Sequence, residues 1–244
     1  MTLLGWFYLL FFIVAIWALL HELFPTSIPG YSSVLLYMEQ AGLNTIISNI
    51  GKTLLNTASG FLLSLLLTII SLIAYYSSSH FALFIEAFNT FVQSVSALVW
   101  ALIFLLIFGL TSNLPPISVV TATSYPILLT LALNGSKVVL EKYGDMAKVM
   151  GARKRHLLRY FILPGSFPYV VGGSRAAVGS ALRISVVAEA LGSSGGVGYM
   201  LVYCYDIGNK GGVFAWSILL ILLMIILDEA ILRPMERWSM NWMS

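Results

Sequence analysis

Residues 145–164 read DMAKVMGARKRHLLRYFILP, and this polar stretch lies between two long apolar runs. From Asp145 to Arg159 it gathers one acid, five Lys or Arg and one His, in a chain with only 9% charged residues. Such a segment cannot lie in the hydrocarbon of a bilayer, whereas the runs on either side of it can. The stretch therefore predicts a connection outside the membrane between two spanning helices.

Composition places the whole chain in the membrane. It has 244 residues, of which 59% are hydrophobic, and its mean hydropathy is +0.92. The apolar runs are continuous rather than alternating, which favours helices over a barrel. We therefore expect an all-α integral membrane protein. The net charge of +3 is best read as a topology signal and implies no nucleic-acid partner, and the single Cys204 excludes an internal disulfide.

The apolar runs predict about six transmembrane helices. We expect Phe81–Leu110, which is longer than a straight crossing needs, to form one span that tilts, bends or begins with an interfacial turn near Glu86 and Asn89. Pro126 should kink the fourth span or delay its start. The predicted spans are Leu3–Leu20, Leu54–Tyr76, Phe81–Leu110, Ile117–Leu133, Phe167–Leu191 and Val213–Leu227, the last extending toward Leu232.

The segments between the spans differ in character. Leu3–Leu20 lacks a basic region before it and a cleavage site after it, so we expect a retained helix. Residues 22–49 contain Pro25, Pro29 and Gly30 and should lie at or outside the membrane surface. Residues 192–198, GSSGGVG, are too rich in glycine to continue a helix, and an irregular connection should follow from Tyr199.

The fifth predicted span carries a ridge of small residues. Gly173, Ala177, Ala181 and Ser185 recur every four residues, and such a ridge lets another helix approach closely in lipid. We therefore expect this span to pack against protein.

The distribution of basic residues predicts the orientation. Seven Lys or Arg lie between Lys137 and Arg159 and two in the C-terminal tail, whereas the connections after the first and fifth spans hold only Lys52 and Lys210. The positive-inside rule then places residues 145–164 and both termini in the cytoplasm.

The stretch has an internal pattern beyond its charge. A basic loop on the cytoplasmic side is an ordinary feature, but Met146, Val149, Met150 and Arg153 recur at helical intervals and form one semi-apolar face. Gly151 should separate two short helices, and Leu163-Pro164 should stop the second at the membrane. A cytoplasmic helix with an apolar stripe and no core of its own needs a partner.

This pattern resembles the permease subunits of binding-protein-dependent ABC importers. Their cytoplasmic loop reads E-A-A-x-x-x-G, then nine residues, then I-x-L-P. Counted from Gly151, this chain has Asp145-Met146-Ala147 for the first three, Phe161 for the isoleucine, and Leu163-Pro164 in register. Asp, Met and Phe replace Glu, Ala and Ile, and each replacement keeps the charge or the apolar character.

The resemblance extends from about Asn49 to the C-terminus. The ordered segments resemble the branch that carries nitrate, sulfonates, taurine and thiamine-precursor pyrimidines, which reads G-L-R, V-x-A-E and G-L-G-Y at similar spacing. The matching segments here are Pro168, Gly173-Ser174-Arg175, Val186-Val187-Ala188-Glu189 and Gly195-Gly196-Val197-Gly198-Tyr199.

The resemblance implies one permease domain over residues 1–244 with the fold of a type I importer. Within it, residues 1–50 would hold the first span and an external segment, residues 51–233 the permease core with a coupling segment at 137–164, and residues 234–244 a cytoplasmic tail. The chain would bind no cofactor and hydrolyse nothing itself, because ATP and Mg²⁺ belong to a separate ATPase subunit. The implied partners are a second permease copy, two ATPase subunits, an extracytoplasmic binding protein and the lipid of a bacterial or archaeal plasma membrane.

Two sets of candidate residues follow. Arg183 lies within a span, where a guanidinium usually faces protein or water, so we expect it either to line the pathway or to pair internally. Glu189 should be a structural or gate hydrogen-bonding group. The pathway set is Arg183 and Glu189, and the ATPase-coupling set is Asp145, Met146, Ala147, Val149, Met150, Gly151, Ala152, Arg153, Leu163 and Pro164.

Two other classes of protein were weighed. A membrane hydrolase would need a nucleophile with a base, or a metal cluster, whereas His21, His80 and His156 are scattered and form no H-E-x-x-H pattern. A secondary transporter or channel would explain the spans but not a coupling-type loop, and the chain shows no internal repeat.

Overall fold

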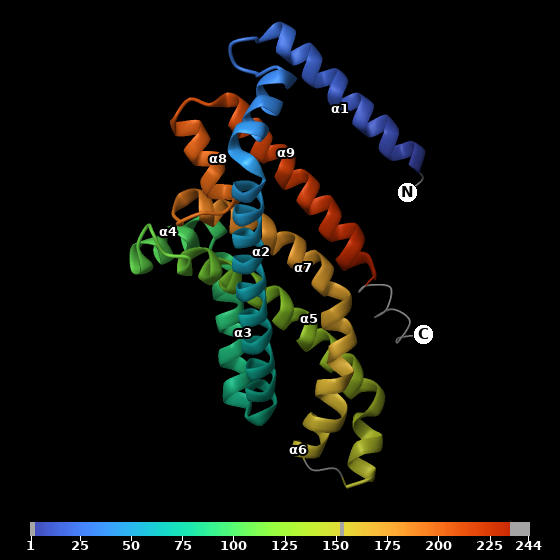
Figure 1. Ribbon diagram of the computed structural model, residues 1–244. Coiled ribbons are helices and arrows are strands. Elements are labelled where there is room, and N and C mark those ends of the chain that lie inside the picture. Colours follow the sequence, from blue (N-terminus) through green and yellow to red (C-terminus); the bar gives the residue numbers. More distant parts are fainter. Residues whose placement is uncertain (1–2, 152–153, 235–244) are drawn as a thin grey trace.

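The computed structural model describes residues 3–151 and 154–234, and every element assigned within those ranges is helical. The helices form an elongated bundle, with α1 diverging from it toward the N-terminus (Figure 1). This arrangement confirms the predicted all-α architecture. The elements are α1 (Leu3–Leu23), α2 (Tyr31–Ser77), α3 (Ser79–Ser94), α4 (Ala97–Phe108), α5 (Leu114–Val149), α6 (Lys154–Leu157), the π-helical turn η1 (Leu158–Ile162), α7 (Leu163–Leu191), α8 (Val197–Asp206), α9 (Lys210–Leu227) and the π-helical turn η2 (Asp228–Leu232).

Among the described residues, four helical runs are long and apolar enough to cross a membrane. They are Tyr31–Ser77, Leu114–Ala147, Arg155–Leu191 and Lys210–Ala230. Helices α3 and α4 add a fifth if the bent pair counts as one span. These four or five candidate spans among the described residues are fewer than the six that the sequence predicted. A helix, α1, does form over the first predicted span.

The distribution of side chains on helix α2 is the reverse of that on a helix of a water-soluble protein. Its exposed side chains are largely leucine and isoleucine, whereas most of its buried ones are small or polar. In lipid this pattern is expected, because apolar side chains gain nothing by leaving the hydrocarbon and small residues allow helices to approach closely. Among the buried α2 residues are Asn49, Thr53, Asn56, Thr57, Gly60, Ser64 and Thr68.

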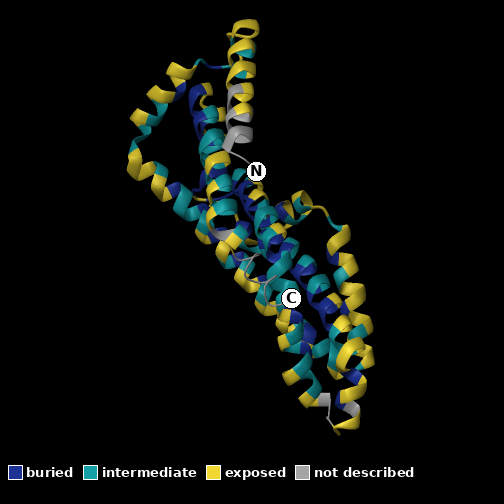
Figure 2. Ribbon diagram, turned by 90° about the vertical axis from the view of Figure 1, so that its right-hand side faces the viewer, coloured by how far each residue is buried: buried dark blue, intermediate teal, exposed yellow. Residues whose placement is uncertain are grey.

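The predicted ridge on α7 is confirmed. Ala177, Ala181 and Ser185 have no exposed surface, and a Cβ added to Gly173 would lie 2.4 Å from Leu131 of α5. Figure 2 shows buried residues along the inner faces of the bundle and exposed ones along its outside. Small residues therefore set the distance between α7 and α5.

Residues 22–49 are helical in their second half, and their position at or outside the membrane surface stays a prediction. Helix α2 begins at Tyr31 and contains the predicted second span, with only a local break at Gly42, where φ is 73°. Pro25 and Pro29 precede the helix and so do not interrupt it. The side chain of Asn49 is hydrogen-bonded within the protein. Its Nδ2 donates to the Thr45 carbonyl at 2.9 Å, and its Oδ1 accepts from the loop after α7.

The run Phe81–Leu110 is sharply bent, which is one of the three predicted alternatives. Helices α3 and α4 meet at an angle of 95°, and the break lies at Val95 and Ser96 rather than near Glu86 and Asn89. Glu86 and Asn89 stay inside α3 because neighbouring helices satisfy them. The Tyr75 hydroxyl donates to Glu86 at 2.8 Å, and the Asn89 amide donates to Thr130 at 3.2 Å.

Three boundaries differ from those that the sequence suggested, since the fourth span does not start late, Pro164 does not stop its helix, and the chain after Tyr199 is helical. Helix α5 passes through Pro126 and on to Val149. Pro164 does not stop the helical run, because α7 begins at Leu163 with a proline in its first turn, where no amide hydrogen is needed. The connection expected from Tyr199 is irregular only at its end, since α8 runs to Asp206.

We predict that the native thiol is unreactive in the folded protein. Cys204 has no exposed surface and donates to the Tyr37 hydroxyl at 3.1 Å, and burial raises the pKa of this thiol above its usual range. Maleimide should label Cys204 only after denaturation. Tyr205, the next residue, is 75% exposed, so a Tyr205→Cys variant should label readily. Equal labelling of the two proteins would contradict the buried position.

Candidate functional site

The predicted coupling segment, residues 145–164, lies at one end of the molecule, where α5 turns back into α6 (Figure 1). Helix α5 carries the chain past the apolar run to Val149, so the first half of the segment is an extension of that span. Gly151 then has φ of 72°, a conformation that favours glycine. Of the predicted coupling residues, Ala152 and Arg153 lie outside the described residues.

The apolar face predicted for this segment is exposed. Val149 is 89% exposed, Met150 75% and Met146 52%. Ala147 is instead fully buried. The face therefore presents three large apolar side chains at the end of the bundle, with Ala147 turned inward and Asp145 at the surface.

The second half of the segment is attached to the core by a residue that the sequence reading missed. Ile162 is 1% exposed and belongs to a cluster with Tyr125 and Leu129 of α5 and Leu72 of α2. It lies at the end of η1, whose wide turn closes with the Leu163 amide donating to the Leu158 carbonyl. Leu163 and Pro164 then begin α7, so any displacement of α6 acts directly on that helix.

Glu189 lies at the other end of α7 and is 1% exposed. Its Oε2 accepts from the Thr53 hydroxyl at 2.8 Å and from the Gly198 amide at 3.2 Å, and its Oε1 accepts from the Asn56 amide at 2.9 Å. Each of these contacts donates to the carboxylate, so they suit the ionised form. This set, which we call the Glu189 network, joins α7, α2 and the beginning of α8.

The loop 192–198 is held down by the same residues of α2. The Gly196 amide donates to Asn49 Oδ1 at 2.9 Å, and the Val197 amide donates to Thr53 Oγ1 at 2.8 Å. A Cβ on Gly196 would lie 2.4 Å from Glu189 Oε2, so only glycine allows the loop to approach so closely. The signal for this site in the sequence is the spacing of Asn49, Thr53 and Asn56 on one face of a helix.

The two predicted pathway residues are not brought together. Arg183 is exposed on the face of α7 away from α5, whereas Glu189 is buried on the inner face. Arg183 lines a cavity of about 350 Å³ between α7 and the end of α9. Arg175 lies eight residues before Arg183, nearer the coupling segment, and pairs with Asp228 at 2.7 Å. The sequence did not predict this ion pair.

A larger apolar cavity of about 830 Å³ lies between α2, α5 and the first turns of α7. Its walls are almost entirely hydrophobic, and it opens beside the attachment of the coupling segment. The residues that line it include Phe61, Leu65, Ile69, Leu72, Ala132, Leu163, Pro164, Phe167 and Val171.

Comparison with known protein families gives one clear match. Residues 66–231 match the model of the family described as binding-protein-dependent transport system inner membrane component. This region covers more than half of the chain and contains both the coupling segment and Glu189.

Two relatives illustrate the range of similarity. An aliphatic sulfonates transport permease protein of Bacillus subtilis is 26% identical over 234 residues, which is 94% of this chain and 84% of that protein. The nitrate import permease protein of Synechococcus elongatus is 32% identical over 120 residues, 49% of this chain and 42% of that protein. The chain therefore matches less than half the length of the nitrate relative.

Solved structures confirm the fold. A crystal structure of an amino acid ABC transporter superposes with a TM-score of 0.68 at 15% identity, covering 85% of this chain and 98% of that one. A methionine ABC transporter in inward-facing conformations gives 0.66, also at 15% identity, covering 81% and 99%. The helices are thus arranged as in the permeases of type I importers.

We predict that Glu189→Gln destabilises the folded protein by about 1–3 kcal/mol, because the new amide must face donors on both sides. Asn56→Asp alone should lower the stability of the folded protein at least as much, since it places a second carboxylate beside Glu189. The double variant Glu189→Gln/Asn56→Asp restores a donor opposite an acceptor and should recover much of the loss. Thermal unfolding in an uncharged detergent measures all three, and additive losses in the double variant would contradict the network.

We predict opposite effects at two glycines of the same region. A Cβ would meet nothing within 4 Å at either Gly144 or Gly151, but only Gly151 has a positive φ. Gly151→Ala should therefore cost about 1–2 kcal/mol in backbone strain, whereas Gly144→Ala, within α5, should stabilise by about 0.5–1 kcal/mol. Thermal unfolding tests both, and a shift in the same direction for the two variants would argue against the turn at Gly151.

Proposed function

This chain belongs to the family of binding-protein-dependent transport system inner membrane components, and from that premise we propose that it forms the translocation pathway of an ATP-driven ABC importer for a small anionic or polar solute. The observation that carries the proposal is the exposed apolar face of Met146, Val149 and Met150, at the position of the coupling motif. Such a patch on a segment outside the bilayer indicates a protein partner.

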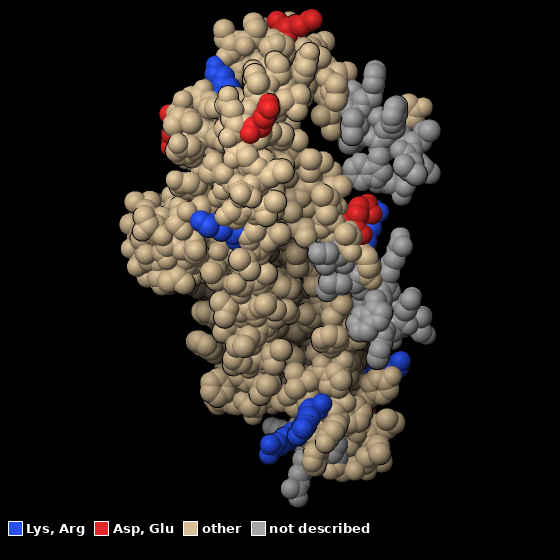
Figure 3. Space-filling model, viewed as in Figure 1, with Lys and Arg blue, Asp and Glu red and all other residues tan. Residues whose placement is uncertain are grey.

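The face shown in Figure 3 supports a membrane position for the bundle. Charged residues lie at its two ends, and the largely uncharged region between them is interrupted by one basic side chain and by a group of both charges at the edge of the view. We assign the end that carries residues 145–164 to the cytoplasm, because its basic residues outnumber those of the opposite connections. The same rule assigns both termini to the cytoplasm of a bacterial or archaeal cell.

The proposed partners follow from the family. Two ATPase subunits would bind ATP and Mg²⁺ and dock on the coupling segments of two permease copies, which we propose are identical. An extracytoplasmic binding protein would deliver the solute. Relatives are named for nitrate, aliphatic sulfonates, taurine, bicarbonate and formylaminopyrimidine, and most of these are small anions or carry an anionic group.

The mechanism that we propose uses α7 as a lever. The helix begins at Leu163 and reaches Glu189 about 39 Å further on, at 1.5 Å for each of the 26 residues between them. A shift of α6 caused by the ATPase is carried through η1 and Ile162 into α7. At the far end, Glu189 joins α7 to α2 and to the loop 192–198, so these parts move as one body when access alternates.

In this scheme Glu189 is a positioning residue and Arg183 lines the pathway. Glu189 is already satisfied by three donors, which suits a fixed joint rather than a proton carrier. Arg183 is exposed beside a cavity, which suits a group that meets the solute.

Co-purification tests the proposal directly. An affinity-tagged chain expressed with its neighbouring genes should bring down an ATPase subunit, whereas a secondary transporter or channel would be isolated without one. A Cys at Ala152 should then cross-link to that subunit, and buried Cys204 provides a silent background. An isolated permease without any ATPase-dependent product would refute docking at this segment.

We predict that Val149→Asp uncouples the transporter. The side chain is 89% exposed, so the variant should fold normally, but a carboxylate in an apolar contact should lower transport and ATPase stimulation about tenfold or more. Val149→Ile keeps the apolar contact and is the matched control. Normal coupled activity of Val149→Asp in proteoliposomes would exclude this face as the docking surface.

A further inference from the structure

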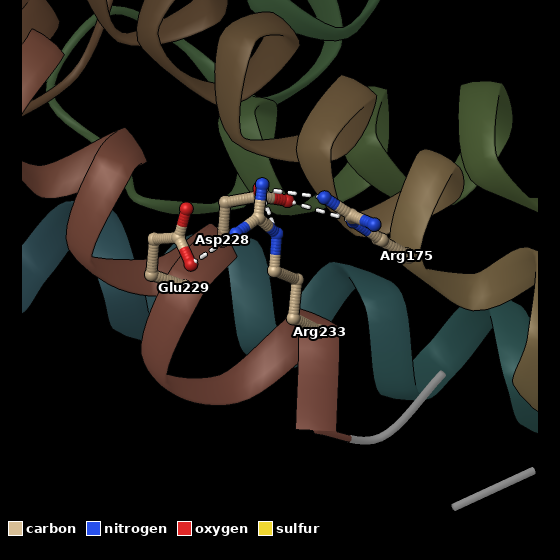
Figure 4. Close-up of polar contacts among 4 residues, drawn as sticks. All are labelled: Arg175, Asp228, Glu229 and Arg233. Carbon is tan, nitrogen blue, oxygen red and sulfur yellow. Dashed lines mark hydrogen bonds and ion pairs between the residues drawn. The ribbon is translucent and has the colours of Figure 1, made fainter. Parts of the chain in front are cut away.

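A group of charged residues lies between α7 and the turn η2 that follows α9. Arg175 of α7 donates to both carboxylate oxygens of Asp228, from Nε at 2.9 Å and from Nη2 at 2.7 Å. Arg233 binds Glu229 at 2.5 Å, and its Nε lies 3.9 Å from Asp228. Figure 4 shows these four side chains gathered between α7 and the turn that ends α9.

Arg183 faces the same space but is not part of these pairs. It lines the 350 Å³ cavity together with Asp228, Glu229 and Arg233. Within residues 3–151 and 154–234 its side chain makes no hydrogen bond or ion pair, although two carboxylates line the same cavity. Both carboxylates already accept from the other two arginines.

Among the described residues that line the cavity, Arg183 is the one charged group without an ion pair. Arg233 pairs with Glu229, and Asp228 pairs with Arg175, which is not part of the lining. An uncompensated guanidinium within a membrane span is unfavourable unless an anion or water meets it. Val178, Leu182 and Met224 supply apolar parts of the cavity wall.

We propose that this cavity is a binding subsite for one singly charged oxyanion, with Arg183 as its principal ligand. A planar guanidinium matches two oxygens of nitrate, bicarbonate, a sulfonate or a phosphate ester. The ion pairs Arg175–Asp228 and Arg233–Glu229 hold the wall together and keep the two acids from neutralising Arg183. The proposal deepens the proposed function and rests on it for the role of the anion in transport.

The test uses the full-length permease in an uncharged detergent. Thermal unfolding is followed while sodium nitrate or sodium methanesulfonate replaces sodium chloride at constant ionic strength, and the saturable shift gives an apparent Kd. Arg183→Gln should weaken this Kd about tenfold or more, because a charged hydrogen-bond donor is lost. Arg183→Lys, which keeps the charge but not the planar fork, should lie between the two.

Two further variants keep the test decisive if Arg183→Gln folds poorly. A Cβ at Gly179 meets nothing within 4 Å, and Gly179 lines the cavity, so Gly179→Leu should fill the space and abolish the anion effect without disturbing helix packing. Glu229→Gln releases Arg233 and should tighten the apparent Kd. Lys142→Gln removes an exposed charge at the other end of the molecule and should leave the Kd unchanged.

A second arm separates a free solute from a lipid headgroup. The permease is placed in phosphatidylcholine nanodiscs with and without phosphatidylglycerol, and competition of the anionic lipid with nitrate is measured. Arg183-dependent stabilisation by nitrate or methanesulfonate assigns the site to a solute, and Arg183-dependent stabilisation by phosphatidylglycerol alone assigns it to a headgroup. Wild type, Arg183→Gln and Gly179→Leu responding alike to every anion would overturn the subsite. The assay needs no ATPase, so its result is independent of the co-purification experiment.

Discussion

The close packing of α7 against α5, and of α2 against α5, is the constraint on which the rest of the structure depends. Apolar side chains gain little by leaving lipid, so van der Waals contact between backbones must hold the helices together. Gly60 shows how tight this contact is, since a Cβ there would lie 2.7 Å from the Ile117 carbonyl oxygen. The faces of α2 and α7 that carry small residues therefore fix the distances between the helices, and with them the distances between the polar groups of the bundle.

The same packing positions the two ends and the outer side of α7, to which we assign the proposed roles. At its beginning, Ile162 is buried among α2 and α5 side chains and holds the coupling segment to the core. At its end, Glu189 meets donors from α2 and from α8. Its outer side, which α5 leaves uncovered, carries Arg175 and Arg183 toward the end of α9. One rigid helix thus connects the proposed docking surface, joint and anion subsite.

The exposed apolar face and the turn at Gly151 were predictable from residues 145–164, because apolar spacing and a glycine are local properties, whereas the coupling role of the segment stays a prediction. The order of spans and the ridge on α7 were predictable for the same reason. The helix boundaries were not. Pro164 suggested a helix end and Glu86 a turn, yet each lies within a helix, because Pro164 falls in the first turn of α7 and the Tyr75 hydroxyl of α2 binds Glu86.

By itself the sequence determined that the chain is a helical membrane protein, which polar segment stays outside the lipid, and which family it belongs to, since length, hydrophobicity and motif spacing are read along one strand of chain. Only the tertiary structure decided that Glu189 meets Thr53 and Asn56, more than 130 residues away, and that Asp228 neutralises Arg175 rather than Arg183. Those pairings depend on helix rotation and separation, which close packing sets and no local pattern encodes.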